Sequence, residues 1–95
     1  MKLVWSEGAL ADLERFAAFL QERHPGLAER IAPEIARRAR MIADHPEIGR
    51  AVGPDRIYRE LAMPILNAVY VFRYSIRPDH VRLLRVFHGR ERRDV

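Results

Sequence analysis

The pattern of apolar and polar positions begins with a short strand and a helix. Residues 2–5 favour a strand, and Ser6 is suited to cap the helix that follows. We expect this helix to end at His24, because Pro25 disfavours helical geometry in the residue before it. Its apolar residues recur at spacings of three and four and predict one buried stripe. The stripe consists of Leu10, Leu13, Ala17 and Leu20, widened by Phe16 and Phe19.

A second helix is predicted from about residue 27 to residue 43. Pro33 falls inside it and predicts a kink or a restart, because proline lacks the backbone N–H and crowds the preceding turn. The apolar stripe again follows the helical period, which places this face against the rest of the protein. Its members are Leu27, Ile31, Ile35, Ala39 and Ile42.

Beyond residue 43 the period changes from that of a helix to that of a strand. Residues 44–55 hold two prolines and two glycines and are predicted to form a loop. Strands are expected at 56–62, 68–76 and 80–88, with turns at 63–67 and 77–79. In the first strand, Ile57, Arg59 and Leu61 share one face. In the second strand, an aromatic stripe is typical of core packing against helices and consists of Tyr70, Phe72 and Tyr74.

This order of elements predicts an α+β fold in a single domain spanning residues 1–95. It comprises a short N-terminal strand, a helical hairpin and a three-stranded antiparallel meander. The hairpin must cover one face of the sheet, because each element needs a place to bury its apolar side. The other face is left partly open, and we expect arginines to line it.

Charge and composition narrow the classes of function. Arginine accounts for 16 of the 17 basic residues, and the formal net charge is +4. Guanidinium groups bind carboxylates and phosphates well, so an anionic partner is expected, either nucleic acid or an acidic protein. The absence of cysteine excludes disulfides and thiolate chemistry. The first residues lack the apolar run of a secretion signal and no stretch is long enough to span a membrane, so we expect a cytoplasmic location.

Candidate chemistry is sparse. No histidine spacing matches a metal site and no glycine-rich phosphate loop occurs, so neither a metal nor a cofactor is expected. His88 closes the last strand beside Arg90 and has the side chain needed for acid–base work near a phosphate. The alternative is a histidine at the end of a strand that only satisfies the backbone.

A set of arginines is the strongest candidate site. Arg59, Arg73 and Arg85 come from three different strands, and Arg90 and Arg92 follow the last one. If their positions align, like charges repel and an anionic partner stabilises them. We therefore predict an anion-binding surface made of Arg59, Arg73, Arg85, Arg90 and Arg92. In the alternative, the internal acids Glu60, Glu91 and Asp94 neutralise the arginines.

Several motifs together resemble the RelE/ParE superfamily of bacterial toxins from type II toxin–antitoxin modules. The opening W-S-x-x-A-x-x-D-L begins at Trp5, and a P-x-x-G-R loop begins at Pro46. An R-E-L strand begins at Arg59, and the ending L-R-V-x-H-G-R spans 84–90. The resemblance covers nearly the whole chain. It implies an α+β toxin that forms a hetero-oligomer with an antitoxin.

The two branches of the superfamily imply different targets. RelE-like toxins cleave messenger RNA on the ribosome with basic residues and often a C-terminal tyrosine, whereas ParE-like toxins inhibit DNA gyrase. Here the strand around Arg59 carries no lysine, Lys2 is the only lysine, and no tyrosine follows Tyr74. These departures favour the ParE-like branch, in which no residue is catalytic. In the RelE-like alternative, His88, Arg59, Arg85 and Arg90 carry proton transfer and phosphate charge.

A third possibility is an inactive toxin-like module that only binds an antitoxin. All three hypotheses predict the same partner, an antitoxin with an acidic, partly disordered segment that folds on this chain. It is expected to add a helix in a groove or a strand to the sheet. The expected landing zones are the apolar face of the helical hairpin and the sheet face lined by arginines.

Overall fold

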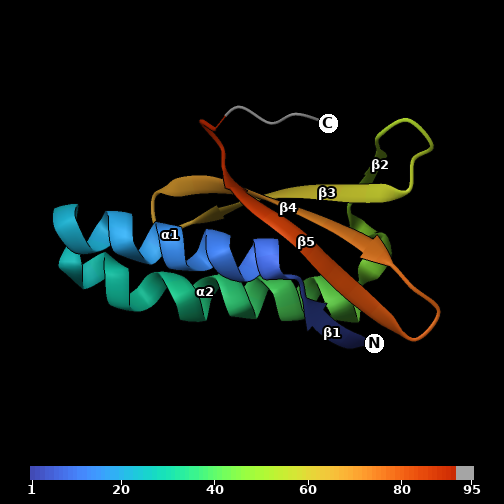
Figure 1. Cartoon of the computed structure of the whole chain (residues 1–95), viewed down its shortest axis with the longest axis horizontal. Helices are drawn as coiled ribbons and strands as arrows, with labels where there is room; N and C mark the ends of the chain where they lie inside the picture. The colour runs from blue at the N-terminus through green and yellow to red at the C-terminus, as the bar shows by residue number, and fades with distance from the viewer. Residues whose placement is uncertain (92–95) are drawn as a thin grey trace.

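Two helices cover one face of a five-stranded sheet in the computed structural model, which describes residues 1–91 (Figure 1). The α+β fold class and the placement of both helices on one face confirm the prediction. Along the chain, the elements are β1 Lys2–Trp5, α1 Glu7–Arg23, α2 Pro25–Asp44, the 3₁₀ helix η1 Pro46–Ile48, β2 Arg50–Val52, β3 Tyr58–Ile65, β4 Ala68–Ile76 and β5 His80–His88.

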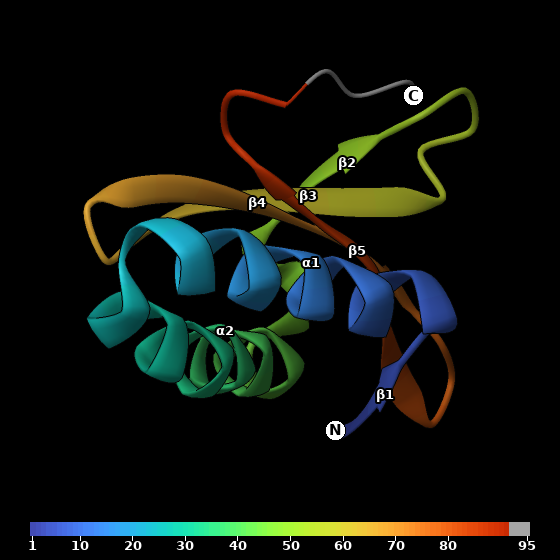
Figure 2. The ribbon, with the colours of Figure 1, turned by 60° about the vertical axis from the view of Figure 1, so that its left-hand side comes forward.

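The sheet is wider than the predicted three-stranded meander. Its strand order is β1-β5-β4-β3-β2, with β1 parallel to β5 and the other pairs antiparallel. The helical hairpin returns the chain so that β1 lies beside β5 (Figure 2). The predicted loop at 44–55 was wrong in part, because it contains η1 and β2. Strand β2 is only three residues long and takes its strand geometry from pairing with β3, which its glycine- and proline-rich surroundings do not reveal.

Helix α1 begins and ends as predicted. The Ser6 Oγ accepts a hydrogen bond from the Ala9 N–H at 3.0 Å, and the helix ends at Arg23. The predicted stripe was partly wrong, because Leu10 and Phe19 are 48% and 55% exposed. The residues that α1 buries most deeply are Ala9, Asp12 and Phe16. The helix is therefore turned so that a carboxylate, and not a leucine, faces the sheet.

Helix α2 confirms most of the predicted stripe, since Ile31, Ile35, Ala39 and Ile42 are buried and Leu27 is half-buried. It begins two residues earlier than expected, at Pro25, where a missing N–H costs no hydrogen bond. The predicted restart at Pro33 was wrong, because the helix continues to Asp44. Pro33 is exposed, and the solvent-facing side of a helix tolerates the lost hydrogen bond best.

Strand β3 begins at Tyr58, two residues later than predicted, and ends at Ile65, inside the expected turn at 63–67. The turn contains only Leu66 and Asn67, whose φ angles are +47° and +70°. Two central residues with positive φ match the right-handed twist of a hairpin. Ile65 and Ala68 flank the turn as a hydrogen-bonded pair, so the next pair, Pro64 and Val69, is not hydrogen-bonded. Pro64 therefore removes no hydrogen bond between β3 and β4.

Strands β4 and β5 match their predicted ranges, and the aromatic stripe of β4 lies in the core. Tyr70, Phe72 and Tyr74 are 4%, 0% and 0% exposed, which confirms the predicted packing. The Tyr74 hydroxyl also holds the segment before β2. It accepts a hydrogen bond from the Gly49 N–H at 2.9 Å and donates one to the Pro46 carbonyl at 2.7 Å. Burial raises the pKa of Tyr74, which keeps this donor protonated.

Candidate functional site

The sheet face opposite the helices carries a row of charged side chains. Cross-strand pairing places Arg50 beside Glu60, Glu60 beside Arg73, and Arg73 beside Arg85. The predicted alignment of arginines on this face therefore holds for Arg73 and Arg85. The row also contains an acid between two of its arginines, so its charges alternate in sign at β3.

Internal carboxylates bind both aligned arginines. The Arg73 Nη2 lies 2.7 Å from the Glu60 carboxylate, and the Arg85 Nε lies 2.7 Å from the Asp12 carboxylate. Glu60 is buried, and the Asp12 side chain is only 4% exposed. The repulsion expected between these arginines is thus relieved within the protein. An external anion at either position must compete with a carboxylate that is already in place.

Asp12 was missed by the sequence analysis, although it is central to the site. Its carboxylate accepts hydrogen bonds from the Arg85 Nε and Nη2, the Arg15 Nη2 and the backbone N–H of Val86, at 2.7–3.1 Å. Burial alone raises the pKa of Asp12, but the hydrogen bonds from Arg85, Val86 and Arg15 outweigh it and hold the pKa below its usual range. Its signals in the sequence were its position on the apolar side of α1 and its place as the aspartate of the opening motif that begins at Trp5.

Arg59 lies on the other face of the sheet, so its predicted place among the open-face arginines was wrong. It pairs with Tyr74, which faces the helices. Its Nη1 donates hydrogen bonds to the carbonyls of Glu47 at 3.3 Å and Gly49 at 2.7 Å. Residues along a strand alternate between the two faces of the sheet, so Arg59 lies on the face opposite to its neighbour in the charged row. Arg59 thus holds the η1 segment, at a distance from Arg85 across the sheet.

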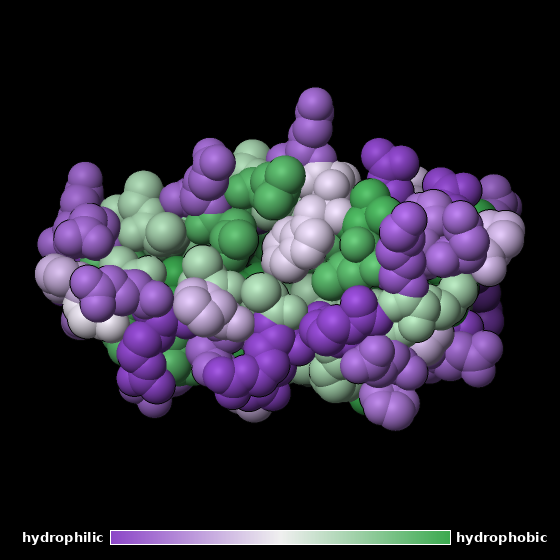
Figure 3. Space-filling model, turned by 90° about the horizontal axis from the view of Figure 1, so that it is seen from below, coloured by the Kyte–Doolittle hydropathy of each residue, from purple (hydrophilic) through white to green (hydrophobic). Residues whose placement is uncertain are grey.

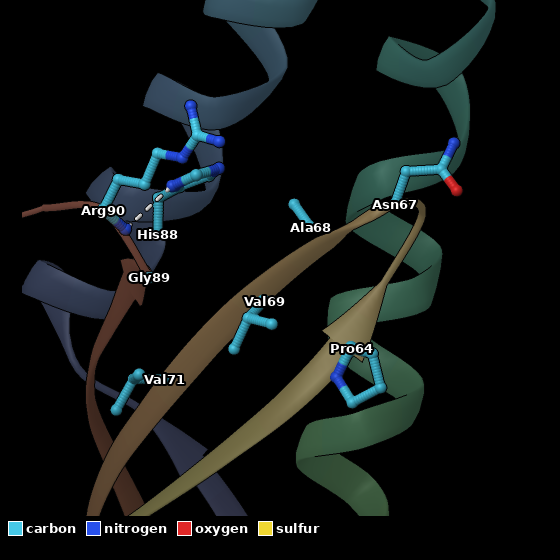
Figure 4. A pocket seen from close by; sticks show the side chains of 8 residues that line it. All are labelled: Pro64, Asn67, Ala68, Val69, Val71, His88, Gly89 and Arg90. Atoms are coloured by element: carbon cyan, nitrogen blue, oxygen red, sulfur yellow. Dashed lines mark hydrogen bonds between the residues drawn. The ribbon is translucent and has the colours of Figure 1, made fainter.

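His88 and Arg90 lie together at the end of β5, as the sequence predicted, but their contact limits the histidine. The Arg90 N–H donates a hydrogen bond to the His88 Nδ1 at 3.1 Å (Figure 4). The neutral ring therefore carries its proton on Nε2, and its lone pair is already engaged. The ring also packs edge-on against Tyr70, with centroids 5.4 Å apart. In this arrangement the Nδ1 of His88 accepts a backbone hydrogen bond, and Nε2 is its remaining hydrogen-bond donor.

A hollow of about 800 Å³ extends from His88 along the sheet. In Figure 4, Val69, Val71 and Pro64 come from β3 and β4, and Arg90 stands at the end beside His88. Among residues 1–91, the Arg90 guanidinium has no ion-pair partner, which distinguishes it from Arg73 and Arg85. Arg92, the fifth predicted anion-binding residue, lies outside the described residues, as does Asp94.

The apolar face of the helical hairpin was expected to receive a partner, but it is buried against the sheet. Apolar surface remains on other parts of the hairpin. Figure 3 shows apolar side chains exposed along the middle of the helix side of the molecule, with charged ones along its margins. At the turn between the helices, a hollow of about 390 Å³ is lined by the apolar residues Phe16, Phe19, Leu20, Leu27, Ile31 and Leu66, together with neighbouring groups.

Within residues 1–91, no three His, Asp or Glu side chains gather closely enough to hold a metal ion. Neither of the helices described here has the length and apolar character needed to cross a bilayer.

Comparison with known proteins agrees with this architecture. A family model described as ParE toxin of type II toxin–antitoxin system, parDE, matches residues 3–93. Toxin RelE1 of Caulobacter vibrioides is 34% identical over 85 residues, which cover 90% of this chain and 89% of that protein. The putative toxin Y4kP of Sinorhizobium fredii is 27% identical over 90 residues, or 95% of this chain and 90% of that protein.

A solved structure described as a chromosomal ParDE TA system from P. aeruginosa has the same fold. Its TM-score is 0.77 at 18% identity, covering 93% of this chain and 95% of that one. The family match spans nearly the whole chain and includes the motifs at Trp5, Pro46, Arg59 and 84–90 that carry the resemblance to the superfamily. The chain therefore belongs to the ParE toxin family of type II toxin–antitoxin systems.

Proposed function

We propose that this toxin inhibits DNA gyrase by binding to it, without catalysing a reaction, and that a cognate antitoxin neutralises it. The geometry of His88 is the observation that supports this most. Its Nδ1 lone pair is engaged by the Arg90 N–H at 3.1 Å. A catalytic nuclease needs a proton acceptor, and the engagement of Nδ1 by a backbone N–H argues against His88 in that role.

The other members of the RelE-like set are also poorly placed for RNA cleavage. In-line cleavage needs a base, an acid and cations that converge on one phosphate. Arg59 lies on the opposite face of the sheet, and Arg85 is held by Asp12. Only Arg90 adjoins His88. These positions support a surface that binds a protein more than one that cleaves RNA.

The antitoxin is expected to bring an acidic segment with apolar side chains. The hollow at the turn between the helices can receive the apolar side chains, and Phe19 at its rim is 55% exposed. Arg23 lies over the Phe19 ring at 3.9 Å, and Arg90 lies nearby at the end of β5. An acidic amphipathic helix fits such a hollow with a basic rim.

A supercoiling assay with purified gyrase tests the proposed target. We expect the toxin to inhibit supercoiling, and an equimolar amount of the antitoxin encoded by the adjacent gene to restore it. Full supercoiling in the presence of excess folded toxin would reject gyrase as the target. Co-expression with the antitoxin should also restore the growth of cells that make the toxin.

A translation extract tests the RelE-like alternative. We expect transcripts to remain intact in the presence of the toxin. Transcript cleavage that disappears in His88→Ala would instead establish a ribosome-dependent endonuclease. If expression of the toxin alone leaves growth unchanged, the chain is an inactive module that binds an antitoxin.

A further inference from the structure

Side chains satisfy the hydrogen-bonding groups along the free edge of β5. Strand β1 pairs with residues 80–83, and within residues 1–91 no strand lies beside the rest of this edge. The Ser6 Oγ donates to the Leu84 carbonyl, Asp12 accepts from the Val86 N–H, and Glu91 accepts from the His88 N–H at 3.1 Å. Two carboxylates thus accept hydrogen bonds from successive outward-pointing N–H groups of β5, where a neighbouring strand would otherwise accept them.

Glu91 occupies this position from the surface. Its carboxylate is shared between the His88 N–H and the guanidinium of Arg15, and its side chain is 27% exposed. Its backbone N–H bonds to the His88 carbonyl at 2.8 Å, so the turn that carries it does not depend on the carboxylate. Rotation of the side chain is therefore enough to uncover both donors.

The carboxylate lies at the rim of a hollow of about 580 Å³, lined by Arg15, Phe16, Phe19, His88, Arg90 and Glu91. Arg15 lies over the Phe16 ring at 4.6 Å, which fixes its guanidinium beside an apolar wall. Arg90 and the Nε2 hydrogen of His88 add further donors. The hollow is therefore built to hold a carboxylate next to apolar groups, and it already holds one from its own chain.

We propose that Glu91 is an internal competitor for the acidic segment of the antitoxin. An acidic side chain of the antitoxin takes the place of the Glu91 carboxylate on Arg15 and on the His88 N–H, while its apolar neighbours enter the hollow beside Phe19. This inference rests on the proposed function, because it takes the partner to be an acidic antitoxin. The occupant follows from charge complementarity, since the site is satisfied by a carboxylate in the free toxin.

Other occupants fit less well. A second copy of this chain brings a net charge of +4 to a basic hollow, so like charges would meet. A nucleic acid could place a phosphate on Arg15 and a base on Phe19, but internal carboxylates already bind Arg73 and Arg85, which leaves fewer cations for a phosphate backbone to follow. Both occupants are outcomes that the experiment below distinguishes.

While an internal competitor occupies a site, the partner cannot bind there. The measured affinity is therefore the affinity of the open site multiplied by the fraction of time that the site is open. The Arg15–Glu91 pair is partly exposed, so the site is free for an appreciable fraction of the time. Removal of the carboxylate should therefore tighten antitoxin binding by about three- to tenfold. A purely structural role for Glu91 predicts the opposite sign or no change.

The test is calorimetric titration of the full toxin with the antitoxin encoded by the adjacent gene. We expect Glu91→Ala to bind three- to tenfold more tightly than the natural toxin, and Arg15→Gln to bind more weakly. Glu14→Ala is the matched control, because Glu14 is exposed on α1 beside Arg15 and its loss changes the net charge equally. If Glu14→Ala tightens binding as much as Glu91→Ala, net charge and not competition is the cause. Unchanged or weaker binding by Glu91→Ala overturns the proposal.

Hydrogen exchange at the His88 amide gives a second readout. In the free toxin this amide should be protected, and Glu91→Ala should expose it because its acceptor is gone. Added antitoxin should restore protection in Glu91→Ala, since the partner's carboxylate takes the vacant place. An amide that stays unprotected in the complex overturns the proposal.

The remaining outcomes separate this inference from the proposed function. Tighter binding of a single-stranded RNA oligonucleotide by Glu91→Ala, without tighter antitoxin binding, assigns the site to a phosphate and rejects the inference. Dimerisation of Glu91→Ala in size-exclusion chromatography with light scattering assigns the site to a second copy. Failure of the antitoxin to restore growth rejects the proposed partner itself, and the inference with it. Restored growth with unchanged affinity ratios rejects only the inference.

Discussion

Asp12 and Glu91 have the same role at the edge of β5, where each carboxylate binds a backbone N–H and the two N–H groups are two residues apart. Their surroundings differ. Each accepts a backbone N–H of β5, and each is bound by Arg15. The Asp12 side chain is 4% exposed and is also gripped by Arg85, whereas the Glu91 side chain is 27% exposed and has no second arginine in the described structure. The carboxylate of Asp12 is thus part of the folded structure, whereas the carboxylate of Glu91 can be replaced by another acid.

The difference shows what determines whether an ion pair can be exchanged. If a buried carboxylate leaves its position, its hydrogen-bond donors stay in the protein interior, where water does not replace the lost acceptor. A carboxylate at the rim exchanges protein donors for water at little cost. Asp12 therefore joins α1 to β5, and Glu91 remains free to give way to another acid.

The largest expected effect comes from removing the buried carboxylate. Asp12→Ala leaves the Val86 N–H without an acceptor and Arg85 without a partner, so we expect the free energy of unfolding to fall by about 2–4 kcal/mol. Urea denaturation followed by circular dichroism measures it. Asp12→Asn keeps an acceptor for Val86 and should lose less. A loss in Asp12→Ala as small as that of a surface variant would remove the contrast with Glu91.

Acid should weaken the same link. The pKa of Asp12 is lowered in the folded state, so its contribution to stability is complete above its ordinary pKa of about 4 and is lost as the pH falls below that value. The stability difference between the natural toxin and Asp12→Asn should therefore shrink below about pH 4. Urea midpoints at a series of pH values measure this. A difference that stays constant down to pH 2 would contradict the prediction.

Replacing Arg85 or Arg15 by lysine tests whether the two ion pairs differ in their contribution to stability. Arg85 grips Asp12 through both Nε and Nη2, and a lysine cannot reproduce that fork. Arg85→Lys should cost about 1 kcal/mol of stability, and Arg15→Lys should cost less because its contacts are more exposed. Thermal unfolding of both variants provides the test. Equal losses would show that burial does not distinguish the two pairs.

The smallest effect is expected at Glu91. Because its carboxylate lies at the rim, Glu91→Ala should change the free energy of unfolding by no more than about 0.5 kcal/mol. The measurement is the urea midpoint, with Glu14→Ala as the matched surface control. A large loss in Glu91→Ala alone would make Glu91 a structural residue like Asp12.

The parts of the fold that were predicted correctly are those with a strong local pattern. Strands 68–76 and 80–88, the Ser6 cap and the buried face of α2 follow from alternation, capping and helical period. Strand β2 was missed because three residues among glycines and prolines carry no such pattern. Its geometry comes from pairing with β3, a contact between separate segments.

The candidate site was harder to predict than the fold. From strand position, the sequence indicated that His88 and Arg90 lie together and that Arg73 and Arg85 could align, and the strand register pairs the two arginines. It placed Arg59 with them in error, because the side of the sheet covered by the helices depends on packing across the whole domain. The alternative in which internal acids neutralise the arginines included Glu60, which binds Arg73. It did not include Asp12, because this partner of Arg85 lies 73 residues away in the chain.

The sequence by itself determined the order of the helices and the long strands, the buried face of α2 and the basic character of the chain, because each depends on neighbouring residues and on composition. Only the tertiary structure decided which arginines are neutralised and which carboxylate can be displaced. Those properties depend on how deeply each acid is buried and on which distant donors reach it, and both arise only when the helices pack on the sheet.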